Sequence, residues 1–157
     1  MTTAEKLVER LAELGKTCGT AESCTGGGVG SAITSAAGAS AVFQGGIISY
    51  DNSVKRNVLG VPQDVLDTKG AVSAECAVAM AEGARRLLKT DFAVSVTGIA
   101  GPGGGSAEKP VGLVWFGIAS SVNVKTEHSV FHGDRGEVRA AAVEHALAML
   151  LAAADER

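Results

Sequence analysis

Hydrophobic residues recur along the chain with two spacings, one typical of helices and one typical of strands. An apolar residue at every third or fourth position indicates an amphipathic helix, and three long segments of this kind begin after Thr2, Ser73 and Asp134. Each of these side chains can accept a hydrogen bond from the first turn of a helix. Shorter helices are predicted at residues 29–37, 54–59 and 63–67. Continuous or alternating apolar runs, which predict strands, occupy residues 16–20, 41–50, 92–97, 111–119 and 124–132.

Strands and helices alternate through the first two-thirds of the chain, without a linker, an internal repeat or a low-complexity segment. This alternation favours a largely parallel sheet that is covered by helices on both faces. We therefore predict a single domain over residues 1–157, with a three-layer α/β/α fold and a mixed, largely parallel sheet. In such folds ligands bind beyond the carboxyl ends of the strands.

The amino-acid composition indicates the cellular compartment and excludes some classes of binding partner. A chain of 157 residues can form one hydrophobic core without cross-links. Its three cysteines are odd in number and lack C-x-x-C spacing, so we expect neither disulfides nor a zinc site. We therefore expect the protein to lie in the reducing cytoplasm. The charged N-terminal segment and the short apolar run at residues 146–154 predict neither a signal peptide nor a membrane span. The net charge of −3 and the aromatic content of 4% argue against a nucleic-acid partner.

Ser23, Cys24 and Thr25 stand in a row directly before a cluster of glycines, between a predicted strand and a predicted helix. The first amides of a helix lack intrahelical partners, so they can bind an anion or a developing oxyanion. A hydroxyl or thiol beside such amides is a candidate nucleophile. On this segment alone, the simpler interpretation is that Ser23 or Thr25 caps the helix.

Two further segments follow strand ends and should converge with Ser23 on one pocket: the stretch from Tyr50 to Lys55, and the glycine-rich loop Gly98–Ser106 after Thr97. The loop contains too much glycine for a helix or a strand. Its amides could form an anion-binding nest to which Thr97 adds a hydroxyl; a flexible surface loop is the alternative. The S-x-x-K spacing at residues 106–109 is not followed by a helix, and we assign it no role.

A serine hydroxyl needs a base before it can act as a nucleophile at neutral pH. A lysine can replace the usual histidine, and Lys55 is the best placed lysine. Its pKa, ordinarily about 10.4, must then be lowered by burial or by a cation such as Arg56 or Arg135. From spacing alone, a solvated helix charge is the simpler interpretation of Lys55. Structural or surface roles are expected for the histidines, which are His128, His132 and His145.

Several motifs, taken in order over nearly the whole chain, resemble the signature of the CinA C-terminal domain family. This family includes stand-alone nicotinamide mononucleotide deamidases of the PncC type. One departure is Gly28, where relatives are expected to carry a bulkier residue. The motifs are Ala21–Gly27, Tyr50–Asn52 with Lys55, Gly70–Ser73, Val94–Pro102, Gly104–Ser106, Lys109–Gly112 and Phe131–Arg135.

The resemblance implies an amidase that converts nicotinamide mononucleotide and water to nicotinic acid mononucleotide and ammonia, without a metal or another cofactor. By position, Ser23 would be the nucleophile, Lys55 its general base, and Tyr50 a partner in proton transfer or substrate placement. The expected substrate-binding residues are Cys24, Thr25, Gly26, Thr97, Gly98, Gly101, Gly105, Ser106 and Arg135. We also expect a homo-oligomer, although the many small residues would allow close helix packing within one subunit as well as between subunits.

Two other hypotheses remain open. The first is a catalytically idle nucleotide-binding or interaction module, because CinA-type proteins are linked by name to competence and DNA damage and a fold does not guarantee activity. The presence of Ser23, Tyr50 and Lys55 argues against it. The second keeps the enzyme but makes Cys24 the nucleophile, since a thiol is intrinsically more reactive; the lack of a nearby histidine ranks it lower.

Overall fold

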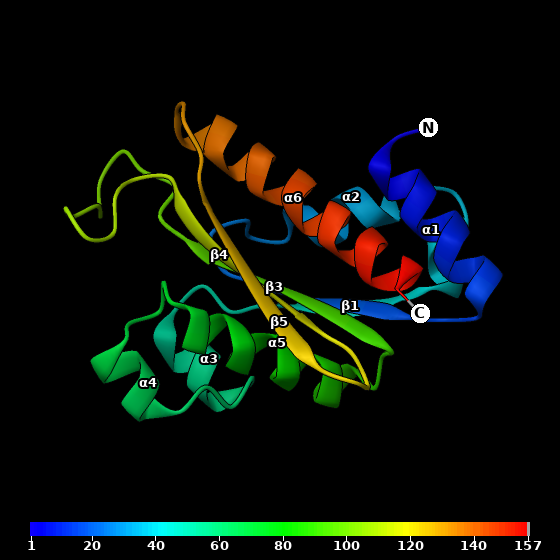
Figure 1. Ribbon diagram of the computed structural model, residues 1–157, viewed down its shortest axis with the longest axis horizontal. Helices are drawn as coiled ribbons and strands as arrows, with labels where there is room; N and C mark the ends of the chain where they lie inside the picture. The colour runs from blue at the N-terminus through cyan, green and yellow to red at the C-terminus, as the bar shows by residue number, and fades with distance from the viewer. Residues whose placement is uncertain (157) are drawn as a thin grey trace.

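The computed structural model describes residues 1–156 of the chain (Figure 1). Its helices are α1 (Thr3–Leu14), α2 (Gly28–Thr34), α3 (Asn52–Asn57), α4 (Gln63–Thr68), α5 (Ala74–Leu88) and α6 (Arg135–Asp155), with a short 3-10 helix, η1 (Ala39–Ala41). Its strands are β1 (Cys18–Glu22), β2 (Phe43–Ile48), β3 (Phe92–Gly98), β4 (Leu113–Ala119) and β5 (Val124–Val130). No helix within residues 1–156 is both long enough and apolar enough to cross a bilayer.

The strands form one five-stranded sheet in the order β2-β1-β3-β4-β5. β1 pairs in parallel with β2 and with β3, whereas β4 pairs antiparallel with β3 and with β5. Four strands therefore run in one direction, and β4 runs against them. The β4–β5 hairpin closes at the predicted turn, where the Ser120 N–H donates to the Asn123 carbonyl over 2.9 Å. The predicted α/β fold with a mixed, largely parallel sheet is confirmed.

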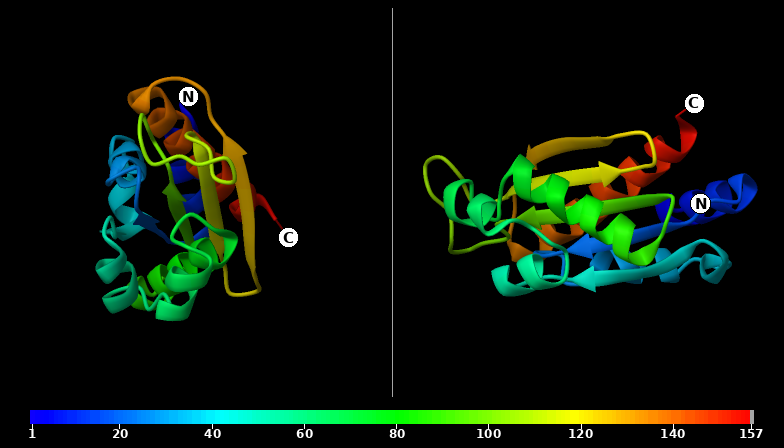
Figure 2. Two further views of the ribbon diagram at one scale, coloured as in Figure 1. Left: turned by 90° about the vertical axis from the view of Figure 1, so that its left-hand side faces the viewer. Right: turned by 90° about the horizontal axis from the view of Figure 1, so that it is seen from below.

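Helices cover both faces of this sheet (Figures 1 and 2). α1, α2 and α6 pack together on one face, and α5 packs on the other face with α3 and α4 beside it. The larger hydrophobic core lies under the first group and includes Leu7, Leu11, Ile33, Phe116 and Leu150. A smaller core lies under α5 and includes Leu59, Val61 and Met80.

Local signals in the sequence correctly predict where the long helices begin. The side chains of Thr2, Ser73 and Asp134 each accept a hydrogen bond from the backbone three residues further on. Each bond satisfies a first-turn N–H that has no partner within the helix. The starts of α1, α5 and α6 are therefore set by residues that immediately precede them.

The histidines take the structural and surface positions that the sequence predicts. His145 lies against Phe116 with ring centroids 4.3 Å apart, and His128 lies against Trp115 at 4.4 Å. His132 is exposed. Within the described part of the chain, no cluster of three or more His, Cys, Asp or Glu side chains could hold a metal ion.

The end of β1 lies two residues beyond its predicted end at residue 20. Glu22 pairs with both neighbouring strands, opposite Ile48 of β2 and Val96 of β3. A central strand is held by ladders on both sides, which prolongs it past the point that its own residues suggest. Ser23 therefore follows the strand directly, at the carboxyl end of the sheet.

The first helix and the first strand after Ser23 are shorter than predicted. α2 ends at Thr34 instead of residue 37, and η1 occupies the beginning of the strand that we predicted at residues 41–50. As a result, Tyr50 lies two residues beyond the end of β2. Gly28 is the first residue of α2, and a Cβ atom there would lie 2.9 Å from Cγ2 of Val143 on α6. The absence of a side chain at this position therefore allows α2 to pack closely on α6.

The start of β4 is displaced from residue 111 to Leu113. Gly112 has a φ of +95°, and a Cβ atom there would overlap the Phe131 carbonyl oxygen. This backbone conformation is unfavourable for residues with a side chain. The glycine thus ends the preceding loop and sets where β4 can begin.

Candidate functional site

The carboxyl ends of three adjacent parallel strands bring the predicted segments together. Ser23 follows β1, Tyr50 follows β2, and Thr97 is near the end of β3. A cavity of about 270 Å³ opens there, as expected for a fold of this class. Its lining residues are Ser23, Cys24, Tyr50, Asn52, Lys55, Ala71, Val72, Thr97, Gly98, Ala100 and Arg135.

Lys55 is buried beneath Ser23, with 1% of its surface exposed. Its Nζ atom donates to Ser23 Oγ over 2.9 Å and to the carbonyl oxygens of Ser49 and Tyr50 over 2.8 and 3.0 Å. Among residues 1–156, no carboxylate forms an ion pair with it. The interpretation of Lys55 as a solvated helix charge is therefore wrong, because α3 directs this side chain into the protein.

Burial lowers the pKa of Lys55, since removal from water disfavours the charged form. A neutral amine would keep two N–H bonds on the carbonyls of Ser49 and Tyr50. Its lone pair would then point along the remaining direction, toward the Ser23 hydroxyl. This arrangement allows Lys55 to accept the Ser23 proton.

The turn after β1 is organised by Glu22, which is only 2% exposed. Its carboxylate accepts hydrogen bonds from the Thr25 hydroxyl (2.7 Å) and from the N–H groups of Val29 (2.8 Å) and Gly30 (3.0 Å). The first-turn amides of α2 are therefore occupied and cannot hold an oxyanion. The amides that we expected for this role near Cys24 to Gly26 precede the helix instead of belonging to its first turn. The N-cap position of α2 is Gly27, so the interpretation of Ser23 or Thr25 as the N-cap is also wrong.

The backbone of the turn leaves two other amides free. The Ser23 N–H donates to the Val96 carbonyl (2.9 Å), and the Gly26 N–H donates to the Ser23 carbonyl (3.1 Å). Gly26 is therefore excluded as an amide donor to a ligand in this conformation. Within residues 1–156, the N–H groups of Cys24 and Thr25 donate to no other residue. Cys24 lines the cavity, whereas Thr25, the next residue, is buried and is not a lining residue.

Cys24 lines the cavity but is a poor nucleophile at neutral pH. Burial raises the pKa of its thiol to about 11, because the thiolate is disfavoured away from water. The Lys55 ammonium donates to Ser23 Oγ and not to this sulfur. The geometry therefore favours Ser23 over Cys24.

Arg135, at the start of α6, links two sides of the cavity. Its guanidinium donates to the Gly101 carbonyl oxygen (2.7 Å) and to the Tyr50 hydroxyl (3.3 Å). Tyr50 is 62% exposed, so both side chains lie at the rim. Within the described residues, Arg135 has no carboxylate partner, and its charge is available to an anion.

The glycine-rich loop is placed differently from the prediction. Gly98 lines the cavity, and the Thr97 hydroxyl next to it donates to the Ala71 carbonyl (2.9 Å). Gly101, Gly105 and Ser106 are not lining residues, and the last two lie in an exposed segment. Gly101 instead accepts a hydrogen bond from Arg135, which lines the cavity.

Sequence reasoning missed five residues that belong to this region. Asn52, Ala71, Val72 and Ala100 line the cavity. Arg139 donates to the carbonyl oxygens of Cys24 (3.0 Å) and Thr25 (3.2 Å). Its position four residues after Arg135, on the same face of a helix, is the one signal that could have found it.

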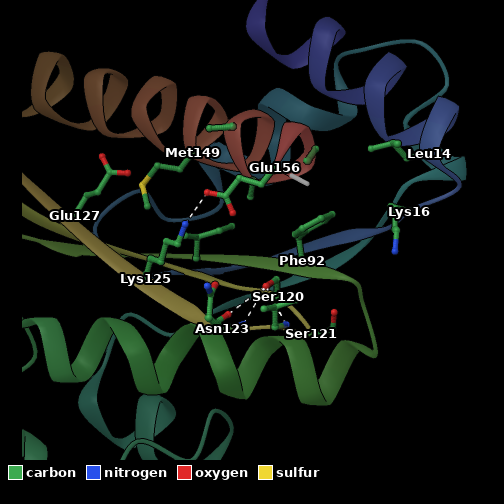
Figure 3. Close-up of a pocket in the computed structure, with 15 residues that line it drawn as sticks. Leu14, Lys16, Phe92, Ser120, Ser121, Asn123, Lys125, Glu127, Met149 and Glu156 are labelled. Carbon is green, nitrogen blue, oxygen red and sulfur yellow. Dashed lines mark hydrogen bonds and ion pairs between the residues drawn. The ribbon is translucent and has the colours of Figure 1, made fainter.

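A larger cavity of about 410 Å³ lies at the opposite end of the sheet, and Figure 3 shows its lining. Its walls include Leu14, Phe92 and Met149. Lys125 at this cavity is paired with Glu156 over 2.6 Å, and the Ser120 hydroxyl belongs to the β4–β5 turn. No lysine donates to a serine hydroxyl here, so the smaller cavity at Ser23 is the better candidate site.

Comparison with known proteins identifies the family of the chain. Residues 1–154 match the family model described as the CinA C-terminal domain. A CinA-like protein of Geotalea uraniireducens is 55% identical over 127 residues, which cover 81% of this chain and 30% of that protein. A CinA-like protein of Synechococcus sp. (strain RCC307) is 56% identical over 116 residues, covering 74% of this chain and 28% of that protein. The chain thus spans about a third or less of these relatives.

Solved structures of related proteins resemble this fold over nearly the whole chain. The competence/damage inducible protein CihA of Agrobacterium tumefaciens superposes with a TM-score of 0.91 at 46% identity, covering 97% of this chain and 96% of that one. A competence-damaged protein (CinA) superfamily protein of Enterobacter cloacae gives a TM-score of 0.93 at 32% identity, covering 99% and 94%. The chain therefore belongs to the CinA C-terminal domain family.

Proposed function

We propose that this domain is a serine amidohydrolase that removes ammonia from the carboxamide of nicotinamide mononucleotide. The observation that carries the proposal is the buried contact of 2.9 Å between Lys55 Nζ and Ser23 Oγ. A lysine without a carboxylate partner, buried against a serine, is the arrangement that Ser–Lys catalysis requires. The choice of substrate rests on the resemblance of the motifs to nicotinamide mononucleotide deamidases.

In the first step, neutral Lys55 takes the Ser23 proton while Ser23 Oγ bonds to the carboxamide carbon. The carbonyl π electrons move to oxygen, and the resulting oxyanion accepts hydrogen bonds from the free N–H groups of Cys24 and Thr25. These donors are fixed before the reaction, so little reorganisation accompanies the development of charge.

In the second step, the Lys55 ammonium returns its proton to the amide nitrogen, the C–N bond breaks, and ammonia leaves an acyl-Ser23 intermediate. Water then attacks the acyl carbon while Lys55 accepts a water proton. Collapse of this second tetrahedral intermediate releases the carboxylic acid, and Lys55 returns the proton to Ser23. One water is consumed, and one ammonia and one acid are formed.

The rim of the cavity suits the nucleotide part of the substrate. The cavity of about 270 Å³ can hold only a small ligand. The nicotinamide ring and its carboxamide would occupy the buried end of the cavity. Among residues 1–156, the Arg135 guanidinium donates only to neutral oxygens, so its charge can bind the phosphate. Tyr50 lies next to Arg135 and would help to place the ribose phosphate.

The test is ammonia release from nicotinamide mononucleotide by the purified protein, measured beside Ser23→Ala and Ser106→Ala. We expect release by the wild type, loss in Ser23→Ala, and retention in Ser106→Ala, which alters an exposed serine outside the cavity. A mass increase that matches the acyl group, found on Ser23 after rapid quenching, would identify the nucleophile. A folded wild type that binds the nucleotide and releases no ammonia would refute the proposal and favour an idle nucleotide-binding module.

A further inference from the structure

Arg139 crosses from α6 to the turn that carries Ser23, although it does not line the cavity. Its Nε atom donates to the Cys24 carbonyl oxygen (3.0 Å), and one terminal nitrogen donates to the Thr25 carbonyl oxygen (3.2 Å). Within residues 1–156 it forms no ion pair, so these two carbonyls are its polar partners. The arginine therefore holds backbone atoms and not another charge.

The two carbonyls determine where the neighbouring N–H groups point. In a trans peptide, the C=O and the following N–H lie in one plane and point in opposite directions. Because the Cys24 carbonyl faces Arg139, the Thr25 N–H faces away from it. The bond from the Gly26 N–H to the Ser23 carbonyl closes a four-residue turn. In turns of this kind, the side chain of the first residue tends to lie on the side of the N–H of the third. We therefore expect the Thr25 N–H to face the Ser23 side chain.

Thr25 is also held from its other side. Its hydroxyl donates to the buried carboxylate of Glu22 over 2.7 Å. That carboxylate also accepts hydrogen bonds from the N–H groups of Val29 and Gly30 in the first turn of α2. Thr25 is thus fixed through its side chain by Glu22 and through its carbonyl by Arg139. The amide that we assign to the oxyanion has little freedom to rotate.

We propose that Arg139 is a positioning residue, which orients and polarises the Cys24–Thr25 peptide so that the Thr25 N–H can stabilise the oxyanion. A charged donor on a carbonyl strengthens the N–H of the same amide as a donor. The effect is largest where negative charge develops, so it acts on the transition state more than on substrate binding. This inference rests on the proposed amidohydrolase function.

Steady-state kinetics with nicotinamide mononucleotide test the proposal in Arg139→Gln and Arg139→Lys. Loss of an oxyanion donor lowers kcat by about 10²–10³-fold, so a misplaced donor should lower kcat by about 10–100-fold in Arg139→Gln. The KM should stay within about twofold, because Arg139 does not touch the substrate. Arg139→Lys should retain more activity, since one ammonium can reach one of the two carbonyls. Arg10→Gln changes a half-buried arginine that does not line the cavity, and it serves as the control.

A second measurement separates positioning from a general loss of structure. The aldehyde analogue of the substrate, with CHO in place of the carboxamide, can add to Ser23 and place its oxygen at the oxyanion donors. Arg139→Gln should weaken binding of this analogue at least about tenfold and leave binding of nicotinic acid mononucleotide unchanged. Equal weakening of both ligands, or a loss of folding in both Arg139 variants, would show a merely structural role.

The outcomes distinguish this proposal from the function on which it rests. An active wild type and an Arg139→Gln variant with unchanged kcat would overturn the role of Arg139 and leave the amidohydrolase intact. A wild type without ammonia release would overturn both. A fall in kcat at constant KM, together with selective loss of the aldehyde analogue, would support both.

Discussion

Two glycine-rich segments follow parallel strands at the same end of the sheet, and the structure treats them very differently. The Ser23–Gly28 turn is held by Glu22 from one side and by Arg139 from the other. In contrast, residues 102–108 are exposed, and Figure 1 shows this yellow-green loop extending beyond the sheet. Glycine content alone therefore does not distinguish a rigid site from a surface loop.

The difference lies in which side chains reach each segment. The base of the exposed loop is tied by Lys109, whose Nζ atom donates to the Lys69 carbonyl oxygen over 2.6 Å. Among the described residues, Ser106 bonds only to Lys109. Its hydroxyl accepts from the Lys109 N–H (3.0 Å), and its own N–H donates to the Lys109 carbonyl (2.8 Å). No buried carboxylate or arginine among the described residues holds the loop tip. The turn is thus ordered by long-range bonds from the buried Glu22 carboxylate and from Arg139, and the exposed loop lacks bonds of this kind.

The largest expected effect comes from comparing the lysines that contact each segment, Lys55 at Ser23 and Lys109 at Ser106. Lys55→Met should lower kcat/KM for ammonia release by about 10²–10⁴-fold, because a general base contributes about that much. Lys109→Met should lower it by less than about threefold, since Lys109 does not line the cavity. Comparable losses in the two variants would remove the distinction between the turn and the loop.

Stability should depend on where a glycine lies within the loop region. Gly112→Ala forces a side chain into a conformation with φ of +95° and against the Phe131 carbonyl, and should destabilise by about 1–3 kcal/mol. At Gly103, no atom lies within 4 Å of an added Cβ, so Gly103→Ala should change stability by less than about 0.5 kcal/mol. Thermal unfolding measures both, at about 2–4 °C for each kcal/mol. Equal melting temperatures would contradict this reading of Gly112.

The pH dependence of kcat/KM should follow the protonation of Lys55, which contacts Ser23. Lys55 must be neutral to accept the Ser23 proton, so kcat/KM should rise about tenfold per pH unit until the lowered pKa of Lys55 is passed. Stability has the same sign: between the folded and unfolded pKa values of Lys55, the unfolded chain binds more protons, so stability rises with pH. This contribution is complete above the unfolded value of about 10.4 and is lost as pH falls through the folded value.

The control for this profile is Ser106→Ala, whose curve should superpose on that of the wild type. If kcat/KM of the wild type stays constant as the pH falls, Lys55 is not the base. The position of the limb, measured from kcat/KM, reports the pKa in the free protein.

The smallest expected effect is that of Ser106→Ala itself. Its hydroxyl is exposed and bonds only to the nearby Lys109 N–H, so kcat/KM should change by less than about twofold and stability by less than about 0.5 kcal/mol. A large rise in KM would instead indicate that the loop closes over the phosphate. That result would return Ser106 to the binding site and weaken the contrast between the two segments.

The sequence by itself determined the elements whose signals are local. Helix starts after Thr2, Ser73 and Asp134 depend on bonds between residues three positions apart, and apolar periodicity shows which face is buried. The alternation of strands and helices was enough to predict the sheet and its layers. The candidate nucleophile and base came from a resemblance of motifs, because spacing alone favoured a helix cap for Ser23 and a solvated charge for Lys55.

Tertiary structure decided how these residues act. The contact between Lys55 and Ser23 spans 32 positions, and those of Arg139 with the turn span 114 and 115. Such contacts depend on the strand order β2-β1-β3 and on the packing of α6, which short patterns in the sequence do not encode. The role of Glu22 is of the same kind: β1 must extend to this residue before its carboxylate can meet the first amides of α2. Only the folded chain places a buried lysine and a serine at one cavity, next to a turn in which two N–H groups donate to no other described residue.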